Sequence, residues 1–285
     1  MTRARHHRPS LAGFVALLIA AVGASPLPLQ AAPTGKLWAR WTAHDPAATA
    51  TVDHAAWAAF LDRYRTAGPD GIARVAYCNV SPADRAALDA YVDRLAATPI
   101  STYARDEQMA YWINLYNALV VRLVLDRFPV ASVRDIDISP GVLSDGPWGR
   151  KLVEVEGEAV SLGDIEHRIL RPIWRDPRVH YALNCAALGS PNLAAEPFRG
   201  ADLEAQLNRA AVAYVNHPRG VTVDGGELVV SKIYTWFKED FGGGDRGVLR
   251  HLKAFAEPEL AMRLERFDDI DDDRYDWTLN RAEGC

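Results

Sequence analysis

The chain has few cysteines, no surplus of basic residues and only one long apolar run. Its 285 residues carry 32 Lys and Arg against 37 Asp and Glu, which gives a formal net charge of −5. Because phosphate contacts need clustered Lys and Arg and no basic stripe is present, we expect no nucleic-acid partner. Hydrophobic residues make up 49% and aromatic residues 9% of the chain, enough to bury a large core, so a disordered protein is not expected.

The sequence patterns that mark metal and nucleotide sites are absent as well. No HExxH or CxxC spacing occurs, so we expect no bound metal. The acidic run at 268–273 lacks the glycine and the distal glutamate of a calcium-binding loop, so a solvated loop is predicted. The glycine run at 242–244 lacks the lysine and the following helix of a phosphate-binding loop. We therefore expect no cofactor.

The one long apolar run lies near the start of the sequence. Arg3, Arg5 and Arg8 precede the run at 11–24, and small residues that suit cleavage follow it. This order predicts a secretory signal peptide over 1–32, with an uncleaved anchor as the alternative. The run is shorter than the roughly 20 residues of a membrane span. We expect a secreted or periplasmic protein with no membrane span after signal cleavage.

Three cysteines are an odd number for an oxidising compartment. Cys78, Cys185 and Cys285 can form at most one disulfide within the chain. A bridge between Cys78 and Cys285 leaves Cys185 free, whereas the opposite arrangement makes Cys185 a bridged, inert residue. Spacing alone does not decide between these pairings.

The pattern of apolar residues predicts an α+β fold, a predominantly helical single domain with two β-hairpins and a buried strand leading to Cys185. Residues 33–52, rich in Ala, Pro and Thr, are predicted to be an extended leader to a domain over 53–285. We expect a monomer by default. The expected helices start near 57 and 81 and span 106–127, 165–170, 203–215, 233–241 and 248–255; the hairpins turn at 156–158 and 224–226, and the strand covers 179–184.

The helix predicted at 106–127 carries a polar stripe on an otherwise apolar surface. Glu107, Tyr111 and Asn114 follow at i, i+4 and i+7, with Asn117 beside them. Buried polar groups are costly unless they are hydrogen-bonded, so each must have a partner. One hypothesis is a structural network. The other is an active-site wall, with Glu107 orienting a histidine and an asparagine stabilising an oxyanion.

Cys185 lies five residues after His180. A thiol and an imidazole are the two groups that a Cys–His nucleophilic site requires. Strand alternation points His180 and Cys185 to opposite faces, which counts against His180 as the direct partner. His167, beside Glu166, is the other candidate base. The structural alternatives are a small buried cysteine and a hydrogen-bonded core histidine.

Five blocks in order resemble the family known as domain of unknown function 547: YWINLYNA, LGDIEH, RVHYALNC, SKI and YDWTLN, found between 111 and 280. The resemblance runs from about Val52 to Asn280 and implies a shared fold, found in exported bacterial proteins and in plants. It implies no particular reaction. Many family members carry a second cysteine just before the proline of the Cys185 block. This chain has Ser190 there, which weakens a disulfide or metal interpretation of that pair.

The leading hypothesis is a thiol-dependent hydrolase or acyl-transfer enzyme with a papain-like or transglutaminase-like mechanism. Cys185 is then the nucleophile, His180 or His167 the base and Glu107 the orienting acid, with Asn114 or Asn117 as oxyanion donor. The substrate is an unidentified small molecule or peptide with a peptide, isopeptide or thioester-like bond. The alternative is a non-catalytic module of the cell envelope that binds a small ligand or a protein, or that serves as an interaction scaffold.

Overall fold

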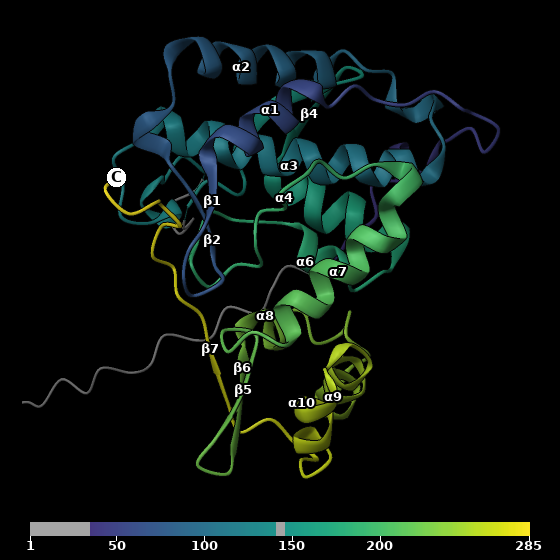
Figure 1. The fold of residues 1–285 in the computed structure, drawn as a ribbon. Helices are drawn as coiled ribbons and strands as arrows, with labels where there is room; N and C mark the ends of the chain where they lie inside the picture. Colours follow the sequence, from purple (N-terminus) through teal and green to yellow (C-terminus); the bar gives the residue numbers. More distant parts are fainter. Residues whose placement is uncertain (1–34, 141–145) are drawn as a thin grey trace, which may run out of the picture. The chain divides into compact units, whose positions relative to one another are not determined.

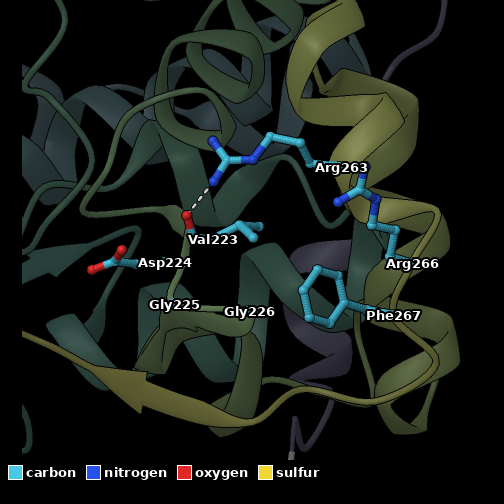
Figure 2. A pocket seen from close by; sticks show the side chains of 7 residues that line it. All are labelled: Val223, Asp224, Gly225, Gly226, Arg263, Arg266 and Phe267. Atoms are coloured by element: carbon cyan, nitrogen blue, oxygen red, sulfur yellow. Dashed lines mark hydrogen bonds between the residues drawn. The ribbon is translucent and has the colours of Figure 1, made fainter.

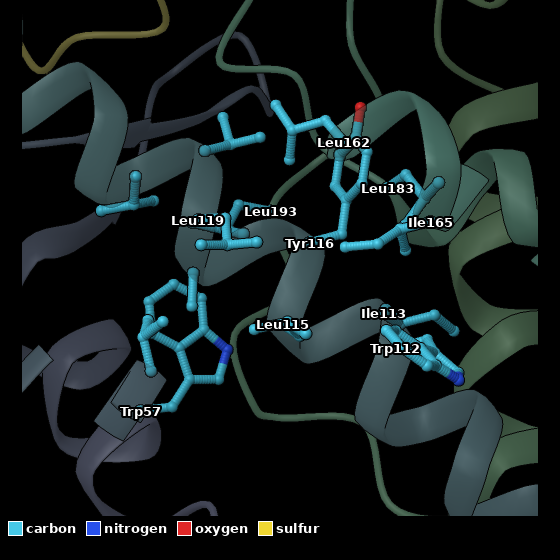
Figure 3. Close-up of a cluster of buried hydrophobic side chains, with 14 of the residues drawn as sticks. Trp57, Trp112, Ile113, Leu115, Tyr116, Leu119, Leu162, Ile165, Leu183 and Leu193 are labelled. Atoms are coloured by element: carbon cyan, nitrogen blue, oxygen red, sulfur yellow. The ribbon is translucent and has the colours of Figure 1, made fainter. Parts of the chain in front are cut away.

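Helix α3 (Arg105–Arg127) is buried along most of its length in the larger of two hydrophobic clusters. The computed structural model describes residues 35–140 and 146–285 (Figure 1). Side chains from distant parts of the chain, such as Trp57 and Leu162, surround α3 in this cluster (Figure 3). The helix is therefore the central core element that its apolar sequence predicts. No helix among the described residues has both the length and the apolar character of a membrane span.

Helices α1 (Ala55–Tyr64) and α2 (Pro82–Ala96) contact each other, and α2 packs on α3. The start of α2 follows from its sequence, because the Ser81 side chain accepts a hydrogen bond from the backbone N–H of Asp84 and Pro82 occupies the first helical position. Short 3-10 turns connect these helices to their neighbours: η1 (Ala39–Thr42), η2 (Tyr77–Asn79), η3 (Ile100–Thr102) and η4 (Val133–Asp135).

The strands form three small sheets, and the α+β class is confirmed. The two predicted hairpins are present as β3 (Lys151–Val155) with β4 (Glu158–Ser161), and β5 (Val221–Asp224) with β6 (Glu227–Ser231). The sequence analysis missed the antiparallel pair β1 (Arg65–Ala67) with β2 (Ala73–Val75). It also missed β7 (Asp272–Arg274), which pairs parallel to β6.

The second hydrophobic cluster joins the β5–β6 hairpin to four helices. Helix α7 has the predicted bounds, whereas α8 ends earlier than expected. The expectation that no helix follows the glycine run at 242–244 is wrong, because α9 begins at Gly244 directly after the two positive-φ glycines Gly242 and Gly243. The four helices are α7 (Leu203–Val215), α8 (Lys232–Trp236), α9 (Gly244–Phe255) and α10 (Pro258–Leu264).

The buried strand predicted before Cys185 is wrong. Val179–Ala182 form the short helix α6, held by turn bonds such as His180 N–H to the Pro177 carbonyl at 3.2 Å. The chain becomes extended only at Leu183, and Cys185 follows two residues later. A short apolar segment does not by itself distinguish a strand from a buried helical turn, which explains the error.

One helical stretch carries Glu166 and His167. It consists of α4 (Leu162–Asp164), the π-helical η5 (Ile165–Leu170) and α5 (Arg171–Trp174). Ser161 and Asp164 cap its start reciprocally, as the sequence predicts for this short helix. π-Helical turns are rare and occur often at functional sites, so Glu166 and His167 on this turn are candidates for a functional site.

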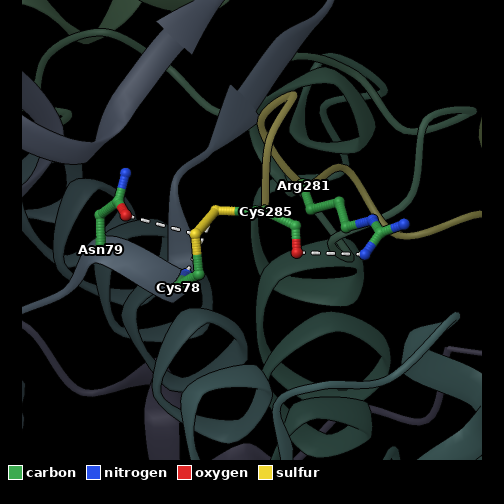
Figure 4. Close-up of a disulfide and its surroundings, with 4 residues drawn as sticks. All are labelled: Cys78, Asn79, Arg281 and Cys285. Carbon is green, nitrogen blue, oxygen red and sulfur yellow. Dashed lines mark hydrogen bonds between the residues drawn. A yellow bond between two sulfur atoms is a disulfide. The ribbon is translucent and has the colours of Figure 1, made fainter.

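Residues 275–282, called the strap here, connect the two halves of the fold. Backbone bonds join it to the Cys185 region, from Gly189 N–H to the Asp276 carbonyl and from Asn280 N–H to the Ala186 carbonyl. A disulfide between Cys78 and Cys285 fixes the chain just beyond the strap and leaves Cys185 as a free thiol (Figure 4).

The segments before α1 complete the described part of the chain. The described residues from 35 onward form one compact unit, and the predicted signal peptide over 1–32 lies outside the described residues. The stretch 33–52, predicted to be an extended leader, contains η1. The side chain of Trp41 in η1 is buried and lies edge-on to Trp112 of α3, with ring centroids 5.0 Å apart.

Candidate functional site

His180 forms a hydrogen-bonded pair with Asp240, a residue that the sequence analysis did not select. Its Nε2 lies 2.7 Å from Asp240 Oδ2. Arg171 holds the same carboxylate through Nε at 2.5 Å and Nη2 at 3.1 Å. Burial alone would raise the pKa of Asp240, but the bonds from His180 and Arg171 outweigh it and hold that pKa well below the usual range. Asp240 is therefore a carboxylate that orients the imidazole.

His167 and Glu166 lie on the other side of His180. Glu166 Oε1 is 3.8 Å from His180 Nδ1 and 3.9 Å from His167 Nδ1. Arg171 Nη1 lies 3.2 Å from His167 Nδ1. Burial lowers the pKa of His167, so the ring is neutral at pH 7. Because a guanidinium only donates, Nδ1 accepts and the ring proton of His167 resides on Nε2.

The ring of Phe237 covers this cluster. It stacks on His180 with centroids 4.2 Å apart and an interplanar angle of 19°, and it lies 5.9 Å from the His167 ring. The Arg171 guanidinium sits over the same ring at 4.7 Å. His180 is consequently only 3% exposed, whereas His167, Glu166 and Asp240 are partly exposed. Phe237 thus shields the buried His180 imidazole from water, while its carboxylate partners reach the surface.

Cys185 lies in a separate group made of hydroxyls. Its sulfur is 2.8 Å from Ser190 Oγ and 3.0 Å from the Tyr275 hydroxyl, and these two oxygens are 3.0 Å apart. Burial raises the pKa of the Cys185 thiol, although the two hydroxyl bonds act in the opposite direction. Across the described ranges no hydrogen bond joins this thiol to His167 or His180. The next residue, Ala186, has φ 59°, a strained conformation for a residue other than glycine.

Two contacts bring the histidine and thiol groups into one region. The Tyr116 hydroxyl from α3 is 3.5 Å from Glu166 Oε2, and the negative charges of Glu166 and Cys185 both contribute to raising the pKa of Tyr116, after burial itself. At the end of α8, Phe237 covers the histidines while its neighbour Trp236 packs on Tyr275 with centroids 5.1 Å apart.

Asn117 holds the segment that carries both groups. Its Nδ2 donates to the Ala182 carbonyl and its Oδ1 accepts from the Asn184 backbone N–H, each at 2.9 Å. These bonds fix the turn between His180 and Cys185. Asn117 therefore positions the site through the backbone.

The other three residues of the predicted stripe lie away from His167 and His180: the Tyr111 hydroxyl donates to the Leu95 carbonyl at 2.8 Å, and Asn114 and Glu107 hold loops. Asn114 bonds the backbone N–H and carbonyl of Phe198, and its Nδ2 lies 3.2 Å from Nε2 of the buried His54. The Glu107 carboxylate accepts the backbone N–H of Val52 at 2.7 Å and of Gly200 at 3.0 Å. The structure pairs Glu107 with two backbone amides and uses Asp240 as the carboxylate beside a histidine.

Sequence reasoning missed Asp240, Arg171, Ser190 and Tyr275 as contributors. Asp240 lies 60 residues from His180, and Tyr275 lies 90 residues from Cys185. No spacing rule links residues that far apart, and the segment 233–241 showed only a helical pattern. Ser190 was noted as a departure from the family pattern, and that position does contact the thiol.

Arg171 supplies positive charge beside His167 and Asp240. Among the described residues no group of three or more His, Cys, Asp and Glu side chains is arranged to hold a metal ion. Near His167 and Asp240 the positive charge comes from the Arg171 guanidinium, which contacts both side chains. The arrangement suits proton transfer and recognition of a negatively charged group.

Part of the chain matches the model of a known protein family. A family model described as "Protein of unknown function, DUF547" matches residues 100–215, a segment that begins at η3 and ends with α7. The match of this segment confirms the predicted resemblance to the DUF547 family. The segment includes His167, His180 and Cys185, whereas Asp240 and Tyr275 lie beyond it. No match is found among curated proteins or solved structures.

The contact between Cys185 and Ser190 leads to a direct prediction. Because the sulfur and the hydroxyl oxygen are 2.8 Å apart, we expect Ser190→Cys to form a disulfide with Cys185 under oxidising conditions. Thiol titration and intact mass should show no free thiol. Ser190→Ala is the control and should keep one titratable thiol. Two free thiols in oxidised Ser190→Cys would contradict the geometry.

Proposed function

We propose that the region around His180 is the catalytic centre of a hydrolase or acyl-transfer enzyme that acts on a carbonyl group. The observation that carries this proposal is the 2.7 Å bond between His180 Nε2 and Asp240, with Arg171 fixing the carboxylate. A carboxylate that binds one ring nitrogen holds a histidine in the tautomer whose other nitrogen accepts a proton. In this enzyme that nitrogen is Nδ1 of His180.

The neighbouring groups have complementary roles in the proposed reaction. His180 Nδ1 takes a proton from water or from an acceptor alcohol or amine, whose oxygen or nitrogen attacks the carbonyl carbon. When the tetrahedral intermediate collapses, the bond to the leaving alcohol, thiol or amine breaks and His180 returns the proton to that leaving group. The N–H at His167 Nε2 stabilises the negative charge that develops on the carbonyl oxygen. Glu166 Oε1 lies 3.8 Å from His180 Nδ1, so its negative charge is next to the atom that receives the proton. Phe237 must move for substrate to reach Nδ1, since it covers the His180 ring.

The proposal is tested with a panel of chromogenic esters, thioesters and peptide amides. We expect His180→Ala and Asp240→Asn to lower kcat/KM by about 10²–10⁴-fold against any substrate turned over by the wild type. His44→Ala, an exposed histidine outside the cluster, is the matched control. An activity that survives His180→Ala within about threefold excludes this residue as the base. A non-catalytic binding module is then the better hypothesis.

The thiol-dependent hydrolase is the second candidate. Two observations favour it: Cys185 is partly exposed, and the strained Ala186 follows directly. Against it stand the raised pKa of the thiol and its hydroxyl partners. Cys185→Ser separates the candidates, because it abolishes a thiol mechanism and leaves a His180-based mechanism active.

Alkylation of Cys185 in the folded protein provides an independent test. From the raised pKa we expect slow labelling by iodoacetamide below pH 8, with labelling that accelerates only above the usual thiol pKa of about 8.5. Fast labelling near pH 6 that is lost in His167→Ala or His180→Ala would instead establish an activated thiol and its base.

We also propose that the protein is exported, on the basis of the predicted signal peptide. The test is the N-terminal sequence of protein recovered from the periplasm or the medium. A mature N-terminus near residue 33 is expected. Recovery of uncleaved protein only in the membrane fraction would favour the anchor.

A further inference from the structure

A surface cavity of about 340 Å³ lies between the β5–β6 hairpin and the end of α10, and none of its lining residues belongs to the histidine cluster. It is lined on one side by the hairpin turn 224–226 and on the other by Arg263, Arg266 and Phe267. Both guanidinium groups and the Phe267 ring face the same space in Figure 2. The volume falls within the range of about 300–1,000 Å³ that is typical of small-molecule pockets.

The two arginines differ in what they bind within the protein. Arg263 donates through Nη2 to the Val223 carbonyl, so its guanidinium is fixed across the mouth of the cavity. For Arg266 the only bond found in the described part of the chain is its backbone N–H to the Arg263 carbonyl. A basic residue near a helix C-terminus is ordinarily explained by the helix dipole, which accounts for Arg263. It does not explain a second guanidinium that lines a concave surface.

On the wall opposite the arginines, the hairpin turn exposes backbone atoms of two glycines. Gly225 and Gly226 have φ 57° and 93°, and a Cβ added at either would meet no atom within 4 Å. A ligand can therefore approach this turn closely. Asp224 also lines the cavity, but its carboxylate points away from both guanidinium groups in Figure 2, so the wall formed by Arg263 and Arg266 is positively charged.

We propose that this cavity binds a small aromatic anion, in which a phosphate monoester or carboxylate group is attached to a flat apolar ring. The fork of donors on Arg263 and Arg266 recognises the anionic group through paired hydrogen bonds. The ring of the ligand packs against Phe267. This site is separate from the proposed catalytic centre.

Calorimetric titration of the whole protein with four probes tests the site. Phenyl phosphate and benzoate distinguish the two anionic groups, inorganic phosphate lacks the ring, and benzyl alcohol lacks the charge. We expect saturable binding of phenyl phosphate or benzoate, weaker binding of inorganic phosphate and none of benzyl alcohol. Higher salt should weaken the binding, because the attraction is between exposed charges.

Three variants assign the binding to these residues. Arg266→Gln and Arg263→Gln should each weaken binding of the aromatic anion at least about tenfold. Arg209→Gln, an exposed arginine on α7, should leave it unchanged. Arg266→Gln is the decisive variant, because among residues 35–140 and 146–285 no hydrogen-bond partner of the Arg266 side chain is found, so its loss should leave the fold intact. No saturable heat with either aromatic anion, or equal affinity in Arg266→Gln and Arg209→Gln, would overturn the proposal.

Discussion

Removal of the Cys78–Cys285 disulfide is expected to lower the free energy of unfolding by about 5 kcal/mol. The bridge joins residues that are 207 positions apart, so it removes a large loop-closure entropy from the unfolded chain. The cysteines lie at the edge of the fold and make few other contacts (Figure 4). The effect should therefore arise mainly from the unfolded state.

Urea unfolding of the double variant Cys78→Ser with Cys285→Ser measures this effect. Cys185→Ser is the matched control, because it removes a sulfur that forms no bridge. The double variant should unfold at a much lower urea concentration, and reduction of the wild type should reproduce that shift. Equal midpoints for oxidised and reduced wild type would show that the bridge contributes little.

Acidification from pH 7 to pH 4 is expected to cost about 3 kcal/mol of stability through His54 alone. Burial lowers the pKa of His54 from its ordinary 6.5 to about 4. The ring is 5% exposed and lies between Tyr91, 2.6 Å from Nδ1, and Asn114, 3.2 Å from Nε2. Because the folded state resists protonation, the unfolded state binds more protons between pH 6.5 and 4. Stability is thus lost as the pH falls through this window and levels off below it.

Unfolding free energies at intervals from pH 7 to pH 3.5 provide the test. Between pH 6.5 and 4, His54→Gln should reduce the slope of unfolding free energy against pH by the amount that corresponds to about one bound proton. In His54→Gln the stability should still fall as the pH is lowered, because burial also lowers the pKa of His251 to about 4. Asp164 titrates in a lower window, because its bonds to Lys151 and Ser161 outweigh the effect of burial and hold its pKa at about 2. An unchanged slope in His54→Gln would contradict the assignment.

Local sequence signals predicted most of the helices and both hairpins. Ser81 and Ser161 each precede a run with helical spacing, and both cap the helices expected of them. Leu203–Val215 has clear one-face periodicity and is a helix with those bounds. These elements could be predicted because capping bonds and amphipathic faces involve residues within a few positions of each other.

The candidate site was predicted less completely, because its contacts are not local. His167, His180 and Cys185 lie in one region, yet two of their partners, Asp240 and Tyr275, come from segments 60 and 90 residues further along the chain. The stripe of α3 shows the opposite error. Glu107 and Asn114 are buried as expected, but backbone groups satisfy them. A sequence pattern reveals that a buried polar group needs a partner and does not reveal which partner it has.

The strap has a consequence for motion at the thiol. Its contacts, such as the Tyr77 hydroxyl to Asn280 and Tyr275 to Cys185, join residues 203 and 90 positions apart. Contacts that close such long loops form late in folding, and a segment can open without global unfolding. Each opening of the strap separates Tyr275 from the sulfur. At a pH high enough for the thiolate to form, the modification rate of Cys185 therefore depends on how often this segment detaches, and the thiol reports local opening.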